Sequence, residues 1–265
     1  MRFWGGWNRL LIIRHKMARA HRHYLPGCIW HITQRCHKKE FLLRFKYYKK
    51  RWMYWLYKAK QQFRISILDY MITSNHIHLL ALSDGKRNDI ARTMHLVSGR
   101  TAWEFNHNRN RKGAFWEDRY HATAVETDDH LIQCMIYIDM NMVRAGIVKH
   151  PAEWPYCGYQ EITNKKLRYT LINKRRLLKI LQIKENNLPG IYNEWINEYL
   201  EQENFYRESC WTESLAVGNK EFVERVRTKL GVRAKGRRII EKSGTFKLRE
   251  PRTSYSLFCP PKKEF

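Results

Sequence analysis

Two histidines separated by one residue are the first feature of this sequence that could do chemistry. His76 and His78 flank Ile77 in an apolar run that is typical of a β-strand. Side chains two positions apart on a strand point to the same side, so the two imidazoles could share one cation while Ile77 faces the core. The alternative is a pair of partly exposed histidines that a sheet surface merely tolerates.

A tyrosine and an asparagine one helical turn apart form the second candidate set. Tyr137 and Asn141 are four residues apart in a segment that we expect to be helical, so they share one face of it. They offer a phenol oxygen and a carbonyl oxygen, and the carbonyl oxygen can bind a metal. The alternative for Tyr137 is a core position, because its neighbours Cys134 and Ile138 are apolar.

The hydrophobic pattern predicts the elements that would position these groups. We expect strands over 28–34, 64–72, 76–82 and 120–126, and helices over 41–62, 88–106 and 128–143. The order is strand, helix, strand, strand, helix, strand, followed by one more helix. This is the ferredoxin-like pattern of the α+β class, an antiparallel four-stranded sheet with two helices on one face. The helix that carries Tyr137 is additional to the pattern.

The remaining segments lie on either side of this pattern. Residues 1–16 are expected to be a loose extension, because Met17 opens a more domain-like segment. The catalytic domain would span residues 17–160. Residues 165–265 are expected to form a basic, mainly helical region, with helices over 173–183, 188–203 and 219–230 and a hairpin through Ser243-Gly244.

Three motifs in a fixed order resemble one protein family. His76-Ile77-His78 is followed by Phe115-Trp116-Glu117-Asp118-Arg119-Tyr120 and then by Tyr137-Ile138-Asp139-Met140-Asn141-Met142-Val143-Arg144-Ala145-Gly146. Together they resemble the REP-associated tyrosine transposases, which are insertion-sequence-200-like single-tyrosine HUH nucleases. The resemblance implies that His76, His78 and Asn141 bind a divalent metal and that Tyr137 is the catalytic nucleophile. One departure is Met142, which stands where the family usually has proline.

The resemblance implies a metal-dependent enzyme that cleaves and rejoins single-stranded DNA near hairpins. The metal would be Mg²⁺ or Mn²⁺, although imidazole ligands suit Mn²⁺ or Zn²⁺ better than Mg²⁺. It would stabilise charge on the phosphate and favour the phenolate of a tyrosine whose unperturbed pKa is about 10. Attack would leave a 5′-phosphotyrosine and a free 3′-hydroxyl. The family also implies a homodimer and a location in the bacterial cytoplasm or nucleoid.

The charge of the chain also favours nucleic acid as the partner. The 50 Lys and Arg exceed the 25 acidic residues and give a formal charge of +25, which attracts phosphate. We expect DNA contacts from two basic stretches and from an aromatic ring that could stack on a base: Lys38, Lys39, Arg44, Lys49, Lys50, Arg100, Arg109, Arg111, Lys112, Trp116 and Arg119. The alternatives are a solvated helix face for the lysines and a core position for Trp116.

Several other function classes are disfavoured by the sequence, and two stay open. The 6 cysteines include no C-x-x-C pair, and no apolar run approaches 18 residues, so we expect reduced thiols, a cytoplasmic chain and no membrane span. One open alternative is a non-catalytic protein of the same fold that binds structured DNA or RNA. The other is a metal-dependent hydrolase that uses water, with Tyr137 only structural.

Overall fold

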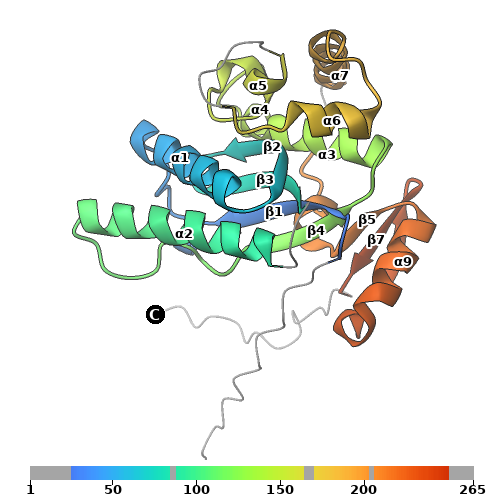
Figure 1. Ribbon diagram of the computed structural model, residues 1–265, viewed down its shortest axis with the longest axis horizontal. Coiled ribbons are helices and arrows are strands. Elements are labelled where there is room, and N and C mark those ends of the chain that lie inside the picture. Colours follow the sequence, from blue (N-terminus) through green and yellow to red (C-terminus); the bar gives the residue numbers. More distant parts are fainter. Residues whose placement is uncertain (1–24, 84–87, 164–169, 203–205, 251–265) are drawn as a thin grey trace, which may run out of the picture.

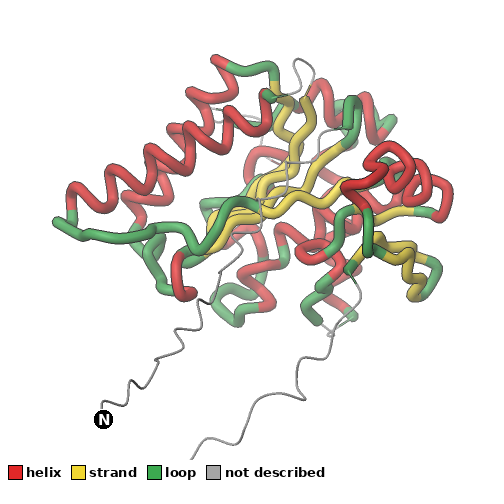
Figure 2. The backbone as a smooth tube through the Cα atoms, turned by 90° about the horizontal axis from the view of Figure 1, so that it is seen from below, coloured by secondary structure: helices red, strands yellow, loops and turns green. Residues whose placement is uncertain are grey.

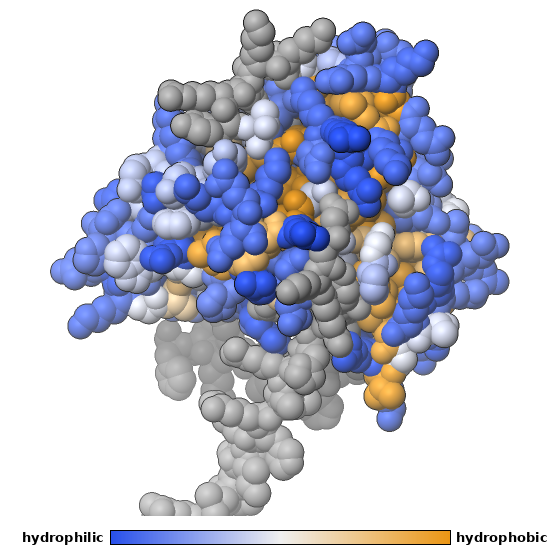
Figure 3. Space-filling model, viewed as in Figure 1, coloured by the Kyte–Doolittle hydropathy of each residue, from blue (hydrophilic) through white to orange (hydrophobic). Residues whose placement is uncertain are grey.

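The computed structural model describes residues 25–83, 88–163, 170–202 and 206–250 (Figure 1). The extension expected over residues 1–16 lies outside the described residues. Among the described helices, none has the length and apolar character needed to cross a membrane. The face seen in Figure 3 carries mostly hydrophilic side chains, with smaller hydrophobic patches between them.

The first half of the described chain forms the ferredoxin-like motif that the hydrophobic pattern predicts. Its strands lie in the order β2-β3-β1-β4, and each is antiparallel to its neighbours. The first helix begins at Lys46, later than expected, and the loop before it contains a short 3-10 helix, η1 (His37–Lys39). The elements of the motif are β1 (Ile29–Arg35), α1 (Lys46–Gln62), β2 (Ile65–Ile72), β3 (His76–Ser83), α2 (Asp89–Asn108) and β4 (His121–Val125).

Alternation along β1 separates the two faces of the sheet. Gln34 accepts a hydrogen bond from the Ser98 hydroxyl of α2 at 2.6 Å, so it faces that helix. His31 is three residues away, hence on the other face, where it bonds to the backbone carbonyl of Trp211 at 2.8 Å. The register of β1 against β3 puts the histidine pair of β3 on the side of His31. Figures 1 and 2 show that helices lie on both sides of the strands.

The helix that carries Tyr137 is broken at Met140. α3 (Asp129–Asp139) ends there, and α4 (Asn141–Arg144) continues to Gly146, which has a φ of +66°. The single helix expected over 128–143 is therefore two consecutive helices. Met142 is buried in α4, and the chain turns at Gly146 without the proline that is usual in the family.

The second half of the described chain first forms short helices and then returns to the sheet. The expected helices are present, but β5, β6 and β7 extend the sheet to the order β2-β3-β1-β4-β5-β7-β6, with β5 parallel to β4. The region expected to be mainly helical therefore also builds the sheet. Its elements are η2 (Pro151–Glu153), α5 (Tyr159–Thr163), α6 (Lys174–Leu181), α7 (Leu188–Glu201), α8 (Cys210–Glu213), β5 (Ala216–Gly218), α9 (Lys220–Leu230), η3 (Gly231–Ala234), β6 (Arg238–Lys242) and β7 (Thr245–Arg249).

Two buried carboxyl groups lie beneath the Tyr137 helix. Asp69 of β2 accepts the backbone N–H of Tyr70 at 2.7 Å, and Asp139 of α3 accepts the Tyr192 hydroxyl at 2.7 Å. Burial raises the pKa of Asp139 to about 7. The pKa of Asp69 is also raised, first by burial and then by the neighbouring Asp139. Gly158 packs directly on Asp69, so a Cβ added there would overlap the carboxylate.

We expect Gly158→Ala to destabilise the fold by about 1–3 kcal/mol, because the new methyl group overpacks a fully buried site. Denaturant unfolding followed by circular dichroism would measure the loss. Gly99→Ala is the matched control, since this helical glycine of α2 has no neighbouring atom within 4 Å of an added Cβ. The control should be stabilised by about 0.5–1 kcal/mol. Equal stability of the two variants would contradict the packing described here.

Candidate active site

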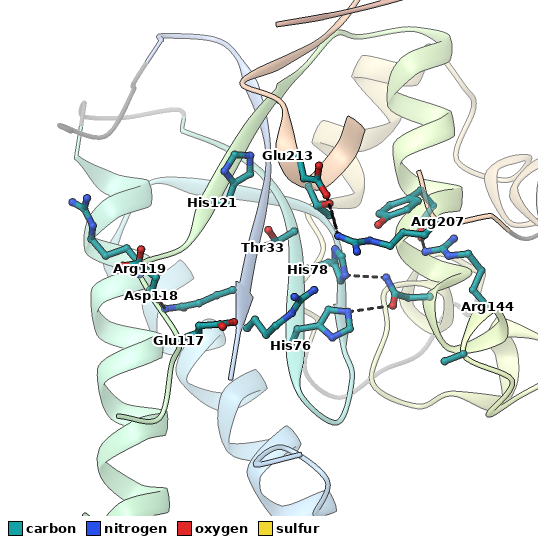
Figure 4. A pocket seen from close by; sticks show the side chains of 16 residues that line it. Thr33, His76, His78, Glu117, Asp118, Arg119, His121, Arg144, Arg207 and Glu213 are labelled. Carbon is teal, nitrogen blue, oxygen red and sulfur yellow. Dashed lines mark hydrogen bonds and ion pairs between the residues drawn. The ribbon is translucent and has the colours of Figure 1, made fainter. Parts of the chain in front are cut away.

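The two histidines of β3 point into one cavity. His78 is buried and His76 is half-buried, and their ring centroids lie 5.0 Å apart. Both line a cavity of about 610 Å³, which Tyr137 and Asn141 also line (Figure 4). The structure thus brings together the four side chains singled out from the sequence, from the adjacent elements β3, α3 and α4.

The carboxamide of Asn141 joins the two imidazoles. Its Nδ2 lies 2.9 Å from Nε2 of His78, and its Oδ1 lies 3.3 Å from Nε2 of His76. The Nδ1 atom of each ring bonds to a different partner. Both Nε2 atoms are therefore turned toward the same point, which is how outer hydrogen bonds orient the histidine ligands of metal sites.

A chain of hydrogen bonds fixes the tautomer of His78. Nδ1 of His31 donates to the backbone carbonyl of Trp211 at 2.8 Å, so Nε2 of His31 accepts from Nδ1 of His78 at 2.9 Å. Burial lowers the pKa of His31 to about 3. Burial, and then the nearby His76, hold the pKa of His78 well below its ordinary value. Both rings are neutral at neutral pH, and Nε2 of His78 carries a lone pair that faces Asn141.

His76 is oriented by a second set of hydrogen bonds. Its Nδ1 lies 2.7 Å from Oδ1 of Asn75, whose Nδ2 donates to the backbone carbonyl of Lys39 at 3.1 Å. That donation fixes the Asn75 amide, so Nδ1 of His76 carries the hydrogen and Nε2 carries the lone pair. Burial, and to a lesser extent the charge of Arg35, lower the pKa of His76 to about 4, so this ring too is neutral.

The centre of the site contains more acceptors than donors. Both Nε2 atoms and Oδ1 of Asn141 carry lone pairs, and only Nδ2 of Asn141 can donate. As the carboxamide is oriented, its Oδ1 faces Nε2 of His76, so two acceptors are in contact. Rotating the carboxamide by half a turn would place Oδ1 against Nε2 of His78 instead, and one contact between two acceptors would remain. A cation would satisfy all three acceptors. Within the described part of the chain, no group of three His, Cys, Asp or Glu side chains could hold a metal, so Asn141 would complete the set.

Tyr137 lies next to this centre. Its ring is 4% exposed and packs 5.9 Å from the His78 ring and 6.1 Å from the His31 ring, measured between centroids. The residue lines the same cavity as the histidine pair. A phenol at the wall of a cavity can meet a substrate phosphate there. Tyr137 also belongs to the buried hydrophobic core, where its ring packs 6.3 Å from the Trp211 ring, so it occupies both a core position and the cavity wall.

Two arginines surround Tyr137. The guanidinium of Arg144 lies 4.2 Å from the Tyr137 ring centroid and donates to the Tyr137 carbonyl at 2.6 Å, and its buried Nη1 has no hydrogen-bond partner among the described residues. Arg207 lines the same cavity, and its charge acts on the Tyr137 phenol. Burial raises the pKa of Tyr137, and the charges of Arg144 and Arg207 act in the opposite direction. Figure 4 shows Arg144 and Arg207 among the side chains that line the cavity.

Several residues expected to bind DNA are exposed. Arg119 lines the cavity together with Glu117 and Asp118. Lys38 and Lys39 lie in η1, next to the loop that holds Asn75 and His76. The other exposed residues lie near two helices. Arg44 and Lys50 lie at the start of α1, and Arg100, Arg109 and Lys112 lie in or just after α2. The helix α2 covers the face of the sheet opposite to the histidines.

Other residues expected to bind DNA are engaged within the protein. Lys49 is 2% exposed and its ammonium donates to the Arg44 carbonyl at 2.8 Å, so it is not available to a phosphate, which corrects the expectation. The Trp116 indole donates to the Ser98 carbonyl at 3.0 Å, and its ring packs against the core, as the alternative held. Arg111 is half-buried, bonds to Asn106 of α2 and to the Ala114 carbonyl, and forms an ion pair with Glu40 at 3.4 Å.

Sequence reasoning missed the surroundings of Tyr137. Arg144 stands within the tyrosine motif, but its place on the Tyr137 ring depends on the turn through α4. Arg35 lines the cavity, and the period of two along β1 puts it on the same face as His31. The sequence therefore contained the signal that could have identified Arg35. Arg207 is 70 positions from Tyr137, and no local pattern connects the two.

Comparison with known proteins bears on the first half of the chain. Residues 24–141 match the family model described as "Transposase IS200 like". No curated protein matches significantly. A solved structure described as a REP-associated tyrosine transposase bound to a REP hairpin has 22% sequence identity and a TM-score of 0.47, covering 58% of this chain and 90% of that chain. Residues 24–141, which contain the histidine pair, Tyr137 and Asn141, are thus similar to the IS200-like transposases.

Proposed function

We propose that this protein is a metal-dependent DNA endonuclease and strand transferase that cleaves and rejoins single-stranded DNA near hairpins. The observation that carries the proposal is the position of Tyr137 beside two imidazoles whose Nε2 lone pairs meet at Asn141. The net charge of +25 supports DNA as the substrate. The hairpin preference rests on the family resemblance of the three sequence motifs.

The site would hold a divalent cation, Mg²⁺ or Mn²⁺, through His76, His78 and Asn141. The excess of acceptors at these three side chains supports that role, because it leaves lone pairs that one cation could satisfy together. When bound, the cation would polarise a non-bridging phosphate oxygen and offset the charge that develops on the phosphoryl group. The donor set contains two imidazoles, which favours Mn²⁺ over Mg²⁺.

Tyr137 would be the nucleophile. A bond forms between its phenol oxygen and phosphorus, the bond from phosphorus to the 3′ oxygen breaks, and that oxygen takes up a proton in place of the one the phenol loses. The 5′-phosphotyrosine keeps the energy of the broken bond, so a second 3′-hydroxyl can rejoin the strand without ATP. Tyr137 lies beside the imidazoles of its own chain, which supports action in cis within each subunit of the homodimer that the family resemblance implies.

Arg144 and Arg207 would assist the attack. Both positive charges lower the pKa of Tyr137 against the effect of burial, so they favour the phenolate. Nη1 of Arg144 is a buried donor without a partner among the described residues, and a phosphate oxygen in the cavity could accept from it. The pair would thus stabilise negative charge on both the nucleophile and the phosphate.

Two other functions use fewer of these features. A non-catalytic DNA or RNA binding protein of the same fold would have no use for two oriented imidazoles beside a phenol. A hydrolase that activates water would use the metal site but would leave Tyr137 as packing. The cationic surroundings of Tyr137 favour the nucleophile over both alternatives.

The covalent step gives the first prediction. Tyr137→Phe should abolish the covalent adduct with a labelled hairpin that has a single-stranded flank, because the attacking oxygen is gone, and binding should change less than about twofold. Denaturing gel electrophoresis in Mn²⁺ or Mg²⁺ would measure the adduct. Tyr54→Phe, on the exposed side of α1, is the matched control and should keep full activity. DNA cleavage that persists in Tyr137→Phe would support the hydrolase instead.

The metal site gives the second prediction. His76→Ala should lose both Mn²⁺ binding in calorimetry and adduct formation, because one of three metal ligands is removed. Chelation by EDTA should abolish adduct formation by the unchanged protein. His107→Ala, an exposed position on α2, is the control and should bind Mn²⁺ normally. Full Mn²⁺ affinity in His76→Ala would remove this histidine from the site.

The arginine beside the phenol gives the third prediction. Arg144→Gln should slow adduct formation by about 10²–10³-fold, the usual effect of removing a donor that stabilises transition-state charge. Mn²⁺ affinity should stay within about twofold, since Arg144 contacts Tyr137 and donates no lone pair to a metal. Rapid quench-flow sampling followed by gel electrophoresis would give the rate of adduct formation. An unchanged rate would make Arg144 a packing residue only.

A further inference from the structure

The hairpin of β6 and β7 has one cationic face. Residues 233–249 contain seven Lys or Arg and one acidic residue, Glu241. The register pairs Arg238 with Arg249, Ile240 with Lys247 and Lys242 with Thr245, so these six side chains share a face. That face has four positive charges and no negative one. The other face includes Glu241 and the buried Leu248, and β7 packs on α9.

The cationic face lines a groove. The groove has a volume of about 710 Å³, and five residues of that face line it, from Ile240 to Arg249. Its opposite wall is built from Gln133 of α3 and from the segment 206–211. Tyr206, at the start of that segment, is 74% exposed. The groove therefore combines a row of positive charges with an accessible aromatic ring.

Of the two acidic residues that line the groove, Glu250 is paired with a cation and Glu208 only accepts a hydrogen bond from a neutral group. Glu250 forms an ion pair with Arg237 at 2.7 Å, and Glu208 accepts from the Trp211 indole at 3.1 Å. Arg249 pairs with Glu213. Among the described residues, no ion pair engages Lys242 or Lys247 on the groove wall. These two ammonium groups are therefore available to a phosphate backbone.

The groove meets the Tyr137 cavity at Arg207. Arg207 lines both spaces, and Glu213, which lines the Tyr137 cavity, pairs with Arg207 at 3.6 Å and with Arg249 of the groove. A strand lying in the groove would therefore reach the Tyr137 cavity beside Arg207. Apart from Gln133, the groove residues lie beyond the segment 24–141 that matches the transposase family.

We propose that this groove binds the single-stranded DNA that flanks the cleaved phosphate. The proposal rests on the proposed function, because the bound strand is the one that Tyr137 would attack. A concave groove with free lysines and an exposed tyrosine suits a single strand, whose phosphates follow the charges and whose bases stack. A two-stranded β-ribbon that reads duplex DNA projects from the protein and enters the major groove of the DNA. Here the cationic face of the hairpin instead lines a concave groove of the protein.

The test compares single-stranded with duplex DNA. Fluorescence anisotropy would measure the Kd of an oligothymidine of about 12 nucleotides, a length within the usual site size, and of a blunt duplex of the same length. The protein would carry Lys242→Ala and Lys247→Ala, with EDTA present so that cleavage plays no part. We expect affinity for oligothymidine to fall at least about 10-fold, and the slope of log K against log salt to lose about 1.4, two phosphate contacts at about 0.7 each.

The matched control carries Lys220→Ala and Lys229→Ala, which remove the same charge from exposed positions of α9. The control should keep its affinity for oligothymidine to within about twofold. Tyr206→Ala should weaken oligothymidine binding but not duplex binding, because it removes stacking. Equal losses in both lysine pairs, or a larger loss for duplex than for oligothymidine, would overturn the proposal.

The adduct assay with Tyr137→Phe separates this proposal from the proposed function. Oligothymidine binding that depends on Lys242 and Lys247, combined with no adduct from the protein that retains Tyr137 in Mn²⁺ or Mg²⁺, would uphold the groove and reject the nuclease. Normal adduct formation with unchanged binding by the lysine variant would uphold the nuclease and reject the groove. Thermal melting of each variant would check that the substitutions, including that of the half-buried Lys247, leave the fold intact.

Discussion

The site depends on holding the imidazoles of His76 and His78 neutral, each in one tautomer. Burial disfavours the charged form of His31, His76 and His78, and all three pKa values lie below the ordinary value. A neutral imidazole has one donor and one acceptor, so fixing the donor fixes the direction of the lone pair. The hydrogen bonds at each Nδ1 therefore decide where each Nε2 points, and both point to Asn141.

The rest of the fold supports this arrangement from several distant segments. The carbonyl that anchors His31 belongs to Trp211, and Arg207 reaches Tyr137 from the same segment. Both lie outside the residues that match the transposase family, yet β5 pairs with β4 and joins that segment to the sheet. The part of the chain beyond residue 141 thus completes the site. The packing of Gly158 on Asp69 holds the layer beneath the Tyr137 helix.

Much of this structure could be predicted from the sequence. Periods of two and of about 3.6 identify the strands and helices of the ferredoxin-like motif, and the H-x-H spacing places two imidazoles on one face of β3. The break at Met140 has no proline or glycine to mark it. β5 has only three residues, too few for an alternating pattern, so its place in the sheet could not be predicted.

The contacts that were missed are long-range or depend on burial. His31 and Trp211 are 180 positions apart, and the carbonyl that Trp211 supplies carries no sequence signal. Lys49 belongs to a basic segment and reads as a surface residue, but Trp154 and Tyr156 cover its ammonium, each ring centroid at 5.3 Å. Tertiary packing therefore decides whether Lys49 can contact DNA, and the pattern of charges in the sequence does not reveal that packing.

Anomalous diffraction from crystals soaked in Mn²⁺ would test the central claim most directly. The orientation of the imidazoles predicts one strong manganese peak between the Nε2 atoms of His76 and His78 and the side-chain oxygen of Asn141, at the wall of the cavity beside Tyr137. A peak elsewhere in the molecule, or none at this position at saturating Mn²⁺, would contradict it.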